Sequence, residues 1–516
     1  MTNIIKTFQS SELTTQCGRK TVPAELLHDE SRMEGRADAA EFPESTEEAA
    51  AILRNASKSK TKVTLSGGRT GIAGGAVPTG GIIISTSKMK KIYGICEDGN
   101  GNVSISCQSG ASLDDINKFI RREKKGFFFP PDPTETSASA GGMTSCNASG
   151  AHTFGYGPTR NYVNAMTVIL ASGEILKLER GKYKASAETN DFILEHNDGR
   201  KEKFTASSRP QPNTKNAAGY FSGKEIDAID LFIGSEGTLG LVTELEFKLI
   251  PCPEAEFNTF FFLSNEDAAI ELTEKLRYVS DKSGITAIEY FDPGALELLR
   301  QRRLKMGPAS CVPPDMPEER ETAGIYIDTT CERKDVQKNI KRLLDISKNL
   351  EKGSLITAWA AFDKDERERL KKFRHALPET VNSTIAERRK THPALTKLGT
   401  DMAVPDKYLG QIMKFYRKKM DAVNLQYVIF GHIGNNHLHV NILPSDMEEY
   451  NLGKKLYMEF AVKVLEMKGS ISAEHGIGKL KKNFLHLMLG DDGIAEMKAI
   501  KKAFDPNSIL GKETLF

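Results

Sequence analysis

The sequence lacks the features of several large protein classes. Its 71 basic and 69 acidic side chains leave a formal charge of +2, which gives no strong field for holding a nucleic-acid backbone or an anionic membrane. No apolar run approaches the roughly 18 residues of a membrane span, and residues 1–16 contain no apolar core of signal-peptide length. Hydrophobic residues at 39% and charged residues at 27% are ordinary for globular proteins. We therefore expect a soluble, folded protein with no nucleic-acid partner and no transmembrane segment.

The sequence also lacks cysteines that are spaced closely enough to suggest a disulfide framework or a metal site. The seven cysteines are odd in number, widely scattered and never arranged as C-x-x-C. This pattern argues against a disulfide framework, a zinc ribbon and a cysteine-ligated iron–sulfur cluster. It is typical of a reducing compartment, and we predict the cytoplasm. The Ser/Thr-rich start resembles an organellar transit peptide, but Glu12 and the scarcity of arginine count against that alternative.

Two common nucleotide-binding motifs are absent as well. The chain contains no G-x-x-x-x-G-K-[ST] and no G-x-G-x-x-G, which argues against Walker ATPases and Rossmann NAD enzymes. Instead, seven glycines crowd residues 66–81, SGGRTGIAGGAVPTGG, between predicted strands at 62–65 and 81–85. Such a loop exposes backbone N–H groups and permits positive φ, which suits a pyrophosphate. The alternative is a mobile surface loop.

Two further segments are rich in glycine and other small residues. One covers residues 139–150, after the P-P-D-P sequence at 130–133, and the other covers residues 234–240, before a predicted strand. Small residues allow the backbone to approach a large flat ligand closely. Three such segments in one region favour a shared ligand site over three idle loops.

Helix caps and prolines divide the chain into two predicted α+β units. Residues 43–48 place a Ser/Thr cap and acids before a helix, and a second helix is predicted at 112–122. Pro251-Cys252-Pro253 interrupts any regular element, so we predict a domain boundary there. A terminal helix is predicted at 492–504. The remaining predicted strands lie at 103–106, 165–170, 174–178, 241–250, 257–263, 324–328 and 355–360, with a charged helix at 335–350.

Histidines gather near the end of the second unit. His432, His437, His439 and His475 occupy two short segments, and Glu474 precedes the last of them. In an extended stretch, His437 and His439 would share one face with Asn441, whereas His432 could join them only across a turn at residues 434–436. Spacing alone leaves the choice of metal ligands open. The alternative is a set of structural histidines that are hydrogen-bonded in a core.

The order of these motifs carries a family resemblance. S-G-G-R-T-G-I-A-G-G, P-P-D-P, N-A-S-G, Y-G-P-T-R, G-S-E-G-T-L-G, G-H-I-G-N-N-H-L-H-V-N and S-A-E-H-G-I-G-K follow one another from about Pro43 onward. The sequence resembles the vanillyl-alcohol-oxidase-type FAD flavoproteins, and among them the D-lactate, glycolate and D-2-hydroxyglutarate dehydrogenase branch. The resemblance implies an α+β fold with a two-part FAD-binding domain and an α+β cap domain that contains an antiparallel sheet.

On this basis the expected domains are an N-terminal extension (1–40), an FAD-binding domain (41–252), a substrate-binding cap (253–478) and a tail (479–516) that packs back toward the flavin domain. The resemblance also implies contacts to FAD. They are Gly67, Gly68, Arg69, Thr70 and Gly71 at the phosphates; Pro131, Asp132, Thr136, Gly141, Gly142, Asn147, Gly150 and Gly157 around the flavin and ribityl chain; Glu236, Gly237 and Val242 on the adenine side; and Asn441 facing the flavin. Some relatives tether FAD through a histidine at the position of Arg69, so we predict noncovalent FAD.

The resemblance further implies a divalent metal, most commonly zinc. The family motif G-H-x-G-D-G-N-L-H corresponds to residues 431–439, and relatives bind metal through its outer histidines and the glutamate of E-H-G-I-G. The implied ligands are His432, His439 and Glu474, a set with an open position for substrate. This chain departs from the motif at residues 435–437, where N-N-H replaces D-G-N. The replacement makes His437 an additional candidate ligand or substrate contact.

The implied reaction is oxidation of a D-2-hydroxy acid, with D-lactate favoured. A metal lowers the hydroxyl pKa while an imidazole accepts the proton, and His475 is the candidate base. Arg374 matches a family arginine that can pair with the substrate carboxylate. Relatives that handle diacids carry a lysine where this chain has Gly399, although Lys397 is near, so a small monoacid is preferred.

Two other functions share parts of these motifs. One is an alkylglycerone-phosphate-synthase-like FAD transferase, which usually has histidine at the position of Glu474. The other is the flavin subunit of an electron-transfer complex. The electron acceptor is expected to be a separate quinone, cytochrome or electron-transfer flavoprotein, because the Rossmann fingerprint of NAD enzymes is missing. A homodimer is compatible with the sequence.

Overall fold

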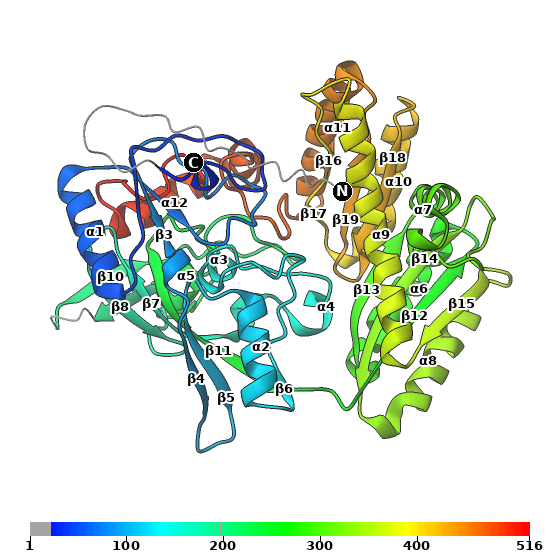
Figure 1. The fold of residues 1–516 in the computed structure, drawn as a ribbon, viewed down its shortest axis with the longest axis horizontal. Helices are drawn as coiled ribbons and strands as arrows, with labels where there is room; N and C mark the ends of the chain where they lie inside the picture. Colours follow the sequence, from blue (N-terminus) through cyan, green and yellow to red (C-terminus); the bar gives the residue numbers. More distant parts are fainter. Residues whose placement is uncertain (1–21, 196–198) are drawn as a thin grey trace, which may run out of the picture.

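The computed structural model describes residues 22–195 and 199–516, so the predictions about residues 1–16 lie outside the described residues. Figure 1 shows two lobes joined by the segment that follows β11. We call residues 22–251 the first lobe and residues 255–466 the second lobe. Helix α12 (Lys482–Phe504) lies with the first lobe, although the whole second lobe precedes it in sequence.

The first lobe begins with a small parallel sheet in the order β1 (Ala39–Glu41), β3 (Ile82–Ser85), β2 (Val63–Ser66). The helix predicted after residues 43–48 is confirmed as α1 (Thr46–Ser59), which connects β1 to β2. Ser45 caps it by accepting a hydrogen bond from the Glu48 amide. The predicted strands at 62–65 and 81–85 are confirmed within one residue, so the first glycine loop runs between two neighbouring parallel strands.

A six-stranded sheet forms the rest of the framework in this lobe, and its pairs are antiparallel. Its strands are β4 (Ile92–Glu97), β5 (Val103–Gln108), β6 (Phe127–Phe128), β7 (Val163–Ile169), β8 (Ile175–Glu179) and β11 (Leu241–Pro251). Strand β11 includes Pro251, one residue beyond the prediction, because proline is tolerated at the end of a strand, where its missing N–H is not needed. The predicted helix at 112–122 is confirmed as α2 (Leu113–Glu123), capped by Ser112.

Short elements complete the first lobe. They are η1 (Ala24–Leu26), η2 (Thr86–Lys88), α3 (Ala140–Ser145), α4 (Thr153–Tyr156), η3 (Thr159–Tyr162), the hairpin of β9 (Asp191–Glu195) and β10 (Lys201–Thr205), and α5 (Ala228–Phe232). Helix α3 carries the second glycine segment and contacts both β5 and β11. The second glycine segment is therefore held directly against the large sheet.

The second lobe is built on one antiparallel sheet of eight strands, which confirms the expected cap architecture. Its order is β15-β12-β14-β13-β18-β19-β16, with β17 pairing to β19. The strands are β12 (Ala255–Leu263), β13 (Ile285–Phe291), β14 (Ala323–Cys331), β15 (Leu355–Ala361), β16 (Leu398–Gly399), β17 (Met402–Ala403), β18 (Tyr427–His432) and β19 (His437–Ile442). The three strands predicted here correspond to β12, β14 and β15.

Helices pack along this sheet, and α9 is prominent between the sheet and the viewer in Figure 1. They are α6 (Glu266–Ser283), α7 (Pro293–Met306), α8 (Val336–Lys348), α9 (Lys364–Arg389), α10 (Leu409–Asp421) and α11 (Met447–Glu466), with short turns η4 (Gly307–Ser310), η5 (Arg333–Asp335), η6 (Asp406–Tyr408) and η7 (Ile433–Asn435). The core beneath α9 is aromatic. Phe373 packs edge-on against Phe260 and stacks on Phe291. This packing fixes α9, and with it Arg374, against the sheet.

The C-terminal segment returns to the first lobe. The backbone of Val63 in β2 accepts a hydrogen bond from Gly511 and donates one to Ile509. The Lys501 ammonium donates to the Thr238 and Leu510 carbonyls at 2.6 and 2.8 Å. Helix α12 begins ten residues before the predicted helix, because two helices join at Gly490, where the backbone is not helical.

The two lobes are also joined by an imidazole. His152, at the start of α4, contacts Asp132 of the first lobe through Nδ1, and its Nε2 lies 2.9 Å from Asp328 of β14. Although burial opposes the charge, the two carboxylates raise the pKa of His152 to about 10. Within the described residues, no helix is both long and apolar enough to cross a bilayer.

Candidate functional site

A cleft opens along the glycine-rich segments of the first lobe. It contains about 1500 Å³, counting space that is open to solvent, and its lining includes the loop after β2, the start of α3 and the turn before β11. Glu474 and His475 also line it, although they follow the second lobe in sequence. The cleft therefore brings the three glycine segments together with part of the histidine cluster.

The glycines of the first loop have two different roles. A Cβ on Gly67 would lie 2.5 Å from Ser139 Oγ, and one on Gly68 would lie 2.9 Å from the Ser137 carbonyl. These two glycines let the loop pack closely on the second glycine segment. A Cβ on Gly71 would meet no heavy atom within 4 Å, so this glycine presents bare backbone to open space. The loop is thus anchored on one side and free on the other, as a cradle for phosphates requires.

Unsatisfied hydroxyl groups line the same cleft. The side-chain oxygens of Ser66, Ser109 and Ser149 are buried and have no hydrogen-bond partner among the described residues. All three residues line the cleft. A buried polar atom without a partner is unusual in a protein and often marks a missing ligand. The ribityl hydroxyls and phosphate oxygens of a dinucleotide can supply these partners. The residues present therefore fit an extended FAD.

The cleft is lined by all of the phosphate and adenine contacts expected from sequence and by two of the expected flavin and ribityl contacts. Those that line it are Gly67, Gly68, Arg69, Thr70, Gly71, Gly141, Gly142, Glu236, Gly237 and Val242. Glu236 is held in place, since its carboxylate accepts hydrogen bonds from the Ile477 and Gly478 amides at 2.7 Å each. Burial raises the pKa of Glu236 despite these bonds. This carboxylate ties the loop after Glu474 to the turn before β11.

The other expected flavin contacts lie outside the lining of the cleft, and several of them have partners within the protein. They are Pro131, Asp132, Thr136, Asn147, Gly150, Gly157 and Asn441. Asp132 pairs with His152, and the side-chain Oδ1 of Asn147 accepts a hydrogen bond from the Arg160 backbone amide. A Cβ on Gly150 would lie 2.1 Å from the Asp132 backbone carbonyl oxygen. These residues shape the backbone around the cleft. As flavin contacts they stay predictions.

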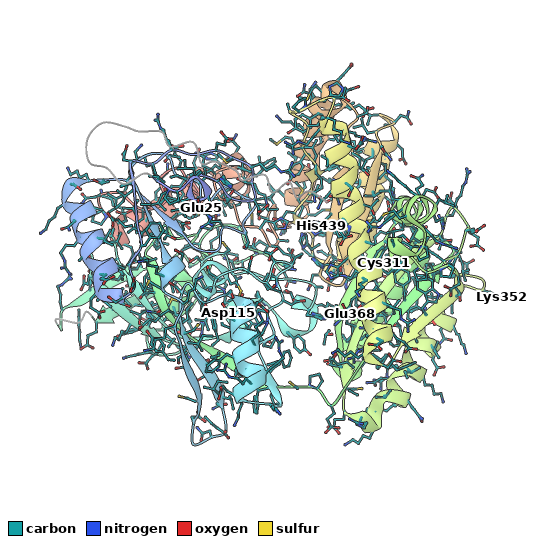
Figure 2. All side chains as sticks on the ribbon, in the orientation of Figure 1. Glu25, Asp115, Cys311, Lys352, Glu368 and His439 are labelled. Atoms are coloured by element: carbon teal, nitrogen blue, oxygen red, sulfur yellow. The ribbon has the colours of Figure 1, made fainter. Side chains whose placement is uncertain are left out.

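The histidine cluster lies on the β18–β19 hairpin. His432 ends β18 directly opposite His437, the first residue of β19, and His439 follows on the same face. The intervening turn places Asn436 in the left-handed region at φ 51°. The expected arrangement across the turn is therefore confirmed. One donor atom from each of His432, His437, His439 and Glu474 lies within 4.8 Å of all the others. His439 is labelled in Figure 2 on the side of the second lobe that faces the first.

Two of these imidazoles are oriented by outer partners. His432 Nδ1 lies 2.6 Å from Glu289 Oε1, and His439 Nδ1 donates to the Thr400 carbonyl at 2.8 Å. Each contact directs Nε2 away from the partner, which is how metal-binding histidines are usually held. Although burial opposes the charge, Glu289 and Glu474 raise the pKa of His432 to about 9, so a metal would have to displace a proton from its Nε2. Burial and the neighbouring imidazoles keep the pKa of His439 well below its usual value, so His439 is neutral. This donor set fits a divalent metal.

Glu474 is the anionic member of the cluster, and it is neutralised in part by the first lobe. Its Oε1 lies 3.3 Å from His432 Nε2 and contacts the Lys215 ammonium, which also donates to the Gly150 carbonyl at 3.2 Å. Although burial opposes ionisation, Lys215 and His432 hold the pKa of Glu474 well below its usual range. The carboxylate is therefore ionised and available as an oxygen ligand.

His475 is held by a buried carboxylate. Asp401 Oδ2 lies 3.3 Å from His475 Nδ1 and accepts the His475 amide at 3.1 Å. Asp401 also accepts hydrogen bonds from the Glu474 amide and the Lys481 ammonium. His475 and Lys481 keep the pKa of Asp401 well below its usual value in spite of burial. An imidazole whose Nδ1 faces a carboxylate has Nε2 free to accept a proton.

Arg374 reaches the cluster through an acid that it shares with His432. Its Nε and Nη2 donate to Glu289 Oε2 at 3.2 and 2.9 Å, while the other oxygen of that carboxylate contacts His432. Although burial opposes ionisation, Arg374 and His432 hold the pKa of Glu289 below its usual range. Among the described residues, Nη1 of Arg374 donates no hydrogen bond. Its two N–H groups therefore remain for a substrate carboxylate.

Three residues of the site were not singled out from sequence. Glu289 interrupts an otherwise apolar strand in which every residue is buried, and that interruption was a usable signal. Asp401 lies two residues after Gly399, in the segment where relatives that handle diacids carry a lysine, and its carboxylate was not predicted to be part of the site. Lys215 stands alone in a loop and gave no signal, because only the docking of the lobes brings it to Glu474.

Comparison with known proteins places these features in a family. Residues 37–179 match the FAD binding domain, and residues 253–513 match the C-terminal domain of FAD linked oxidases. A D-lactate dehydrogenase from Anaerostipes hadrus is 30% identical over 94% of this chain and 91% of its own length. A glycolate oxidase subunit from Bacillus subtilis is 28% identical, covering 93% and 89%. A D-2-hydroxyglutarate dehydrogenase from Stutzerimonas stutzeri is 29% identical, covering 92% and 90%.

Solved structures support the fold. An alkyldihydroxyacetonephosphate synthase structure superposes with a TM-score of 0.61 at 15% identity, covering 93% of this chain and 76% of its own. Likeness at this identity concerns the fold alone. The cradle, the unsatisfied hydroxyls and the matched domains agree on the cofactor. The chain is an FAD-binding enzyme of the FAD-linked oxidase family, with the vanillyl-alcohol-oxidase-type fold.

Proposed function

We propose that this protein is an FAD-dependent dehydrogenase that oxidises a D-2-hydroxy acid, with D-lactate favoured, to the 2-oxo acid. One observation carries the proposal. His475 and Glu474 line the same cleft as the glycine loop. Glu474 belongs to the cluster that contains the two oriented imidazoles, and the His475 ring stacks on that of His439 with centroids 6.0 Å apart. A proton acceptor, a candidate metal site and the expected position of the flavin therefore meet at one place. The curated relatives named as D-lactate, glycolate and D-2-hydroxyglutarate enzymes support the substrate class.

We propose noncovalent FAD and a divalent metal, zinc in the first instance, held by His432, His439 and Glu474. Bound FAD supplies a hydride acceptor, and a bound metal lowers the pKa of the substrate hydroxyl. Arg69 stands where a covalent tether would need histidine. It lines the cleft with the loop glycines. Flavin that is released into the supernatant when the protein is denatured supports the noncovalent part, and flavin that stays with the polypeptide refutes it.

The chain's own residues account for the proton and the orientation of the substrate. The Nε2 atom of His475 accepts the hydroxyl proton, while Asp401 stabilises the resulting imidazolium through Nδ1. The free edge of Arg374 pairs with the substrate carboxylate, and Glu289 keeps the guanidinium in position. A lysine at position 399 would require Asn441 to shift, because a Cβ on Gly399 would lie 2.9 Å from Asn441 Oδ1. The absence of that lysine supports a small monoacid.

The proposal also covers partners and location. We propose a separate electron acceptor of the quinone, cytochrome or electron-transfer-flavoprotein type. We also propose a cytoplasmic location, which is supported by the six described cysteines, all of them free. Zebrafish and Arabidopsis relatives are described as mitochondrial. The Arabidopsis relative is also described as a cytochrome-linked D-lactate dehydrogenase. Fractionation of the native host cell tests the location.

The deciding experiment is anaerobic reduction of the bound flavin. D-lactate is expected to bleach the yellow flavin absorbance, whereas L-lactate leaves it unchanged. The same assay on glycolate and D-2-hydroxyglutarate ranks the substrates. An unchanged spectrum across all D acids overturns the proposed function. Bleaching by D-2-hydroxyglutarate alone replaces the monoacid with a diacid.

A further inference from the structure

His437 is the residue at which the hairpin differs most in chemistry from the family motif. The motif has asparagine at this position, and this chain has an imidazole. The side chain is fully buried, with 0% of its surface exposed. Its ring centroid lies 5.3 Å from that of His432 and 4.4 Å from that of His439. The substitution therefore adds a third imidazole to the middle of the candidate metal site.

Neither ring nitrogen of His437 has an aligned hydrogen bond among the described residues. Nε2 lies 3.0 Å from Asp401 Oδ1, and Nδ1 lies 3.9 Å from Glu474 Oε1. Burying an imidazole without hydrogen-bond partners costs free energy, so such a group needs another source of stabilisation. The lone pair of Nδ1 faces the same carboxylate that the candidate ligands surround.

The neighbours of His437 limit what it can do. Asp401 is already engaged by Lys481 and by the Glu474 and His475 amides, so it has little need for another donor. An Nε2–H directed toward Asp401 leaves Nδ1 as an acceptor, the form required of a metal ligand. The donor atoms of all four residues lie within 4.8 Å of one another, close enough to surround a single ion.

We propose that His437 is a fourth protein ligand, through Nδ1, to a divalent first-row metal. The site then has three imidazoles and one carboxylate, instead of the two imidazoles and one carboxylate implied by the family motif. This inference rests on the metal site of the proposed function and sharpens it. A tetrahedral zinc ion with four protein ligands has no open position, so a substrate must expand the coordination to five or six. Metals that readily take six ligands should therefore support turnover at least as well as zinc.

The test counts imidazoles directly. The full-length protein with bound flavin is loaded with zinc and measured by X-ray absorption. Three imidazoles per zinc ion are expected in the wild type and two in His437→Asn, which restores the family residue. Chelator competition should show at least tenfold weaker zinc binding by the variant. A wild-type count of two overturns the inference without any need for a variant, so a folding defect cannot hide the answer.

Controls separate this inference from the proposed function. His486→Asn removes an exposed histidine that pairs with Asp491, and it should leave zinc affinity unchanged. Equal zinc affinity in His437→Asn and the wild type overturns the fourth ligand. Flavin bleaching by D-lactate in the same samples reports the proposed function separately. Bleaching with a count of two keeps the function and removes His437, whereas wild-type protein that binds no metal removes both the ligand and the metal site.

Discussion

The cleft and the histidine cluster face each other, yet they are built in opposite ways. The cleft depends on missing side chains. Gly71 presents bare backbone, and the hydroxyl groups of Ser66 and Ser109 have no hydrogen-bond partner in the part of the chain that the structure describes. The cluster depends on extra side chains, since His432 and His475 each have a carboxylate behind them. The hydrogen bonds of the cleft are completed only when a ligand binds, whereas the side chains of the histidine cluster are already oriented without a ligand.

The largest effect should come from the cluster's candidate base. His475→Ala removes the proton acceptor but leaves the glycine loop intact, so bound flavin is retained while kcat falls by about 10²–10⁴-fold. Absorbance measures the bound flavin, and steady-state turnover measures kcat. His486→Ala, at an exposed position, is the matched control. Undiminished turnover in His475→Ala removes this residue as the base.

The next effect concerns the cation that joins the two regions. Lys215→Met leaves the buried Glu474 carboxylate without its ammonium partner, which should destabilise the metal-free protein by up to about 3 kcal/mol. Zinc can replace the lost charge, so the destabilisation should shrink on metal loading. Thermal unfolding with and without zinc measures both values. If the loss of stability is equal with and without zinc, Lys215 contributes packing and does not neutralise the charge of Glu474.

A somewhat smaller effect is expected behind the imidazoles. Glu289→Gln keeps the shape but loses the charge shared by His432 and Arg374, so metal affinity should fall roughly 10–100-fold. The KM for the acid should rise with it, since Arg374 loses its anchor. Glu297→Gln, on the surface of α7 beside Arg300, is the matched control. If metal affinity and KM both stay at wild-type values, Glu289 is not a positioning residue.

The contact between the lobes should depend on pH. The folded pKa of His152 is about 10 against an ordinary 6.5, so its stabilising effect is complete below pH 6.5 and is lost as the pH rises through 10. His152→Asn should therefore cost roughly 2 kcal/mol at pH 6, the size of a hydrogen bond between charged groups, and almost nothing above pH 10. Thermal unfolding across this range measures the difference. A cost that does not change with pH contradicts the charged bridge.

The smallest effect should come from the cleft. Ser109→Ala removes a hydroxyl that has no partner, so the flavin-free protein should keep or slightly increase its stability. Flavin affinity should fall by about tenfold, the worth of one hydrogen bond. Flavin titration measures the change in flavin affinity, and unfolding of the flavin-free protein measures the change in stability. Equal flavin affinity would place the Ser109 hydroxyl outside the cofactor site.

Sequence reasoning found residues of both regions but missed the outer partners of the cluster, for a physical reason. A cradle made of backbone needs glycine at each close approach, and glycine is visible in the sequence at Gly67 and Gly68. Outer partners such as Glu289 and Lys215 are ordinary residues until the fold brings them to the site. The period of two residues did predict that His437 and His439 share a face, because that relation is local.

The same distinction holds for the fold. Strands and capped helices such as α1 and α2 were predicted within a few residues, because caps and apolar runs are local signals. The early start of α12 was missed, since Gly490 reads as a helix end and the structure uses it as a joint between two helices. The position of Glu289 in β13 depends on the pairing of this strand with β14 and β18, which no local pattern specifies.

The return of the chain to β2 makes the second lobe an insertion within the first. Val63 pairs with backbone around Ile509, so the sequence separation of this contact spans the whole second lobe. Such a contact carries a large loop-closure entropy and slows folding. Cutting the chain after Pro251 would leave β2 with an unpaired edge. An isolated first lobe should therefore include residues 479–516, joined by a short linker that replaces the second lobe.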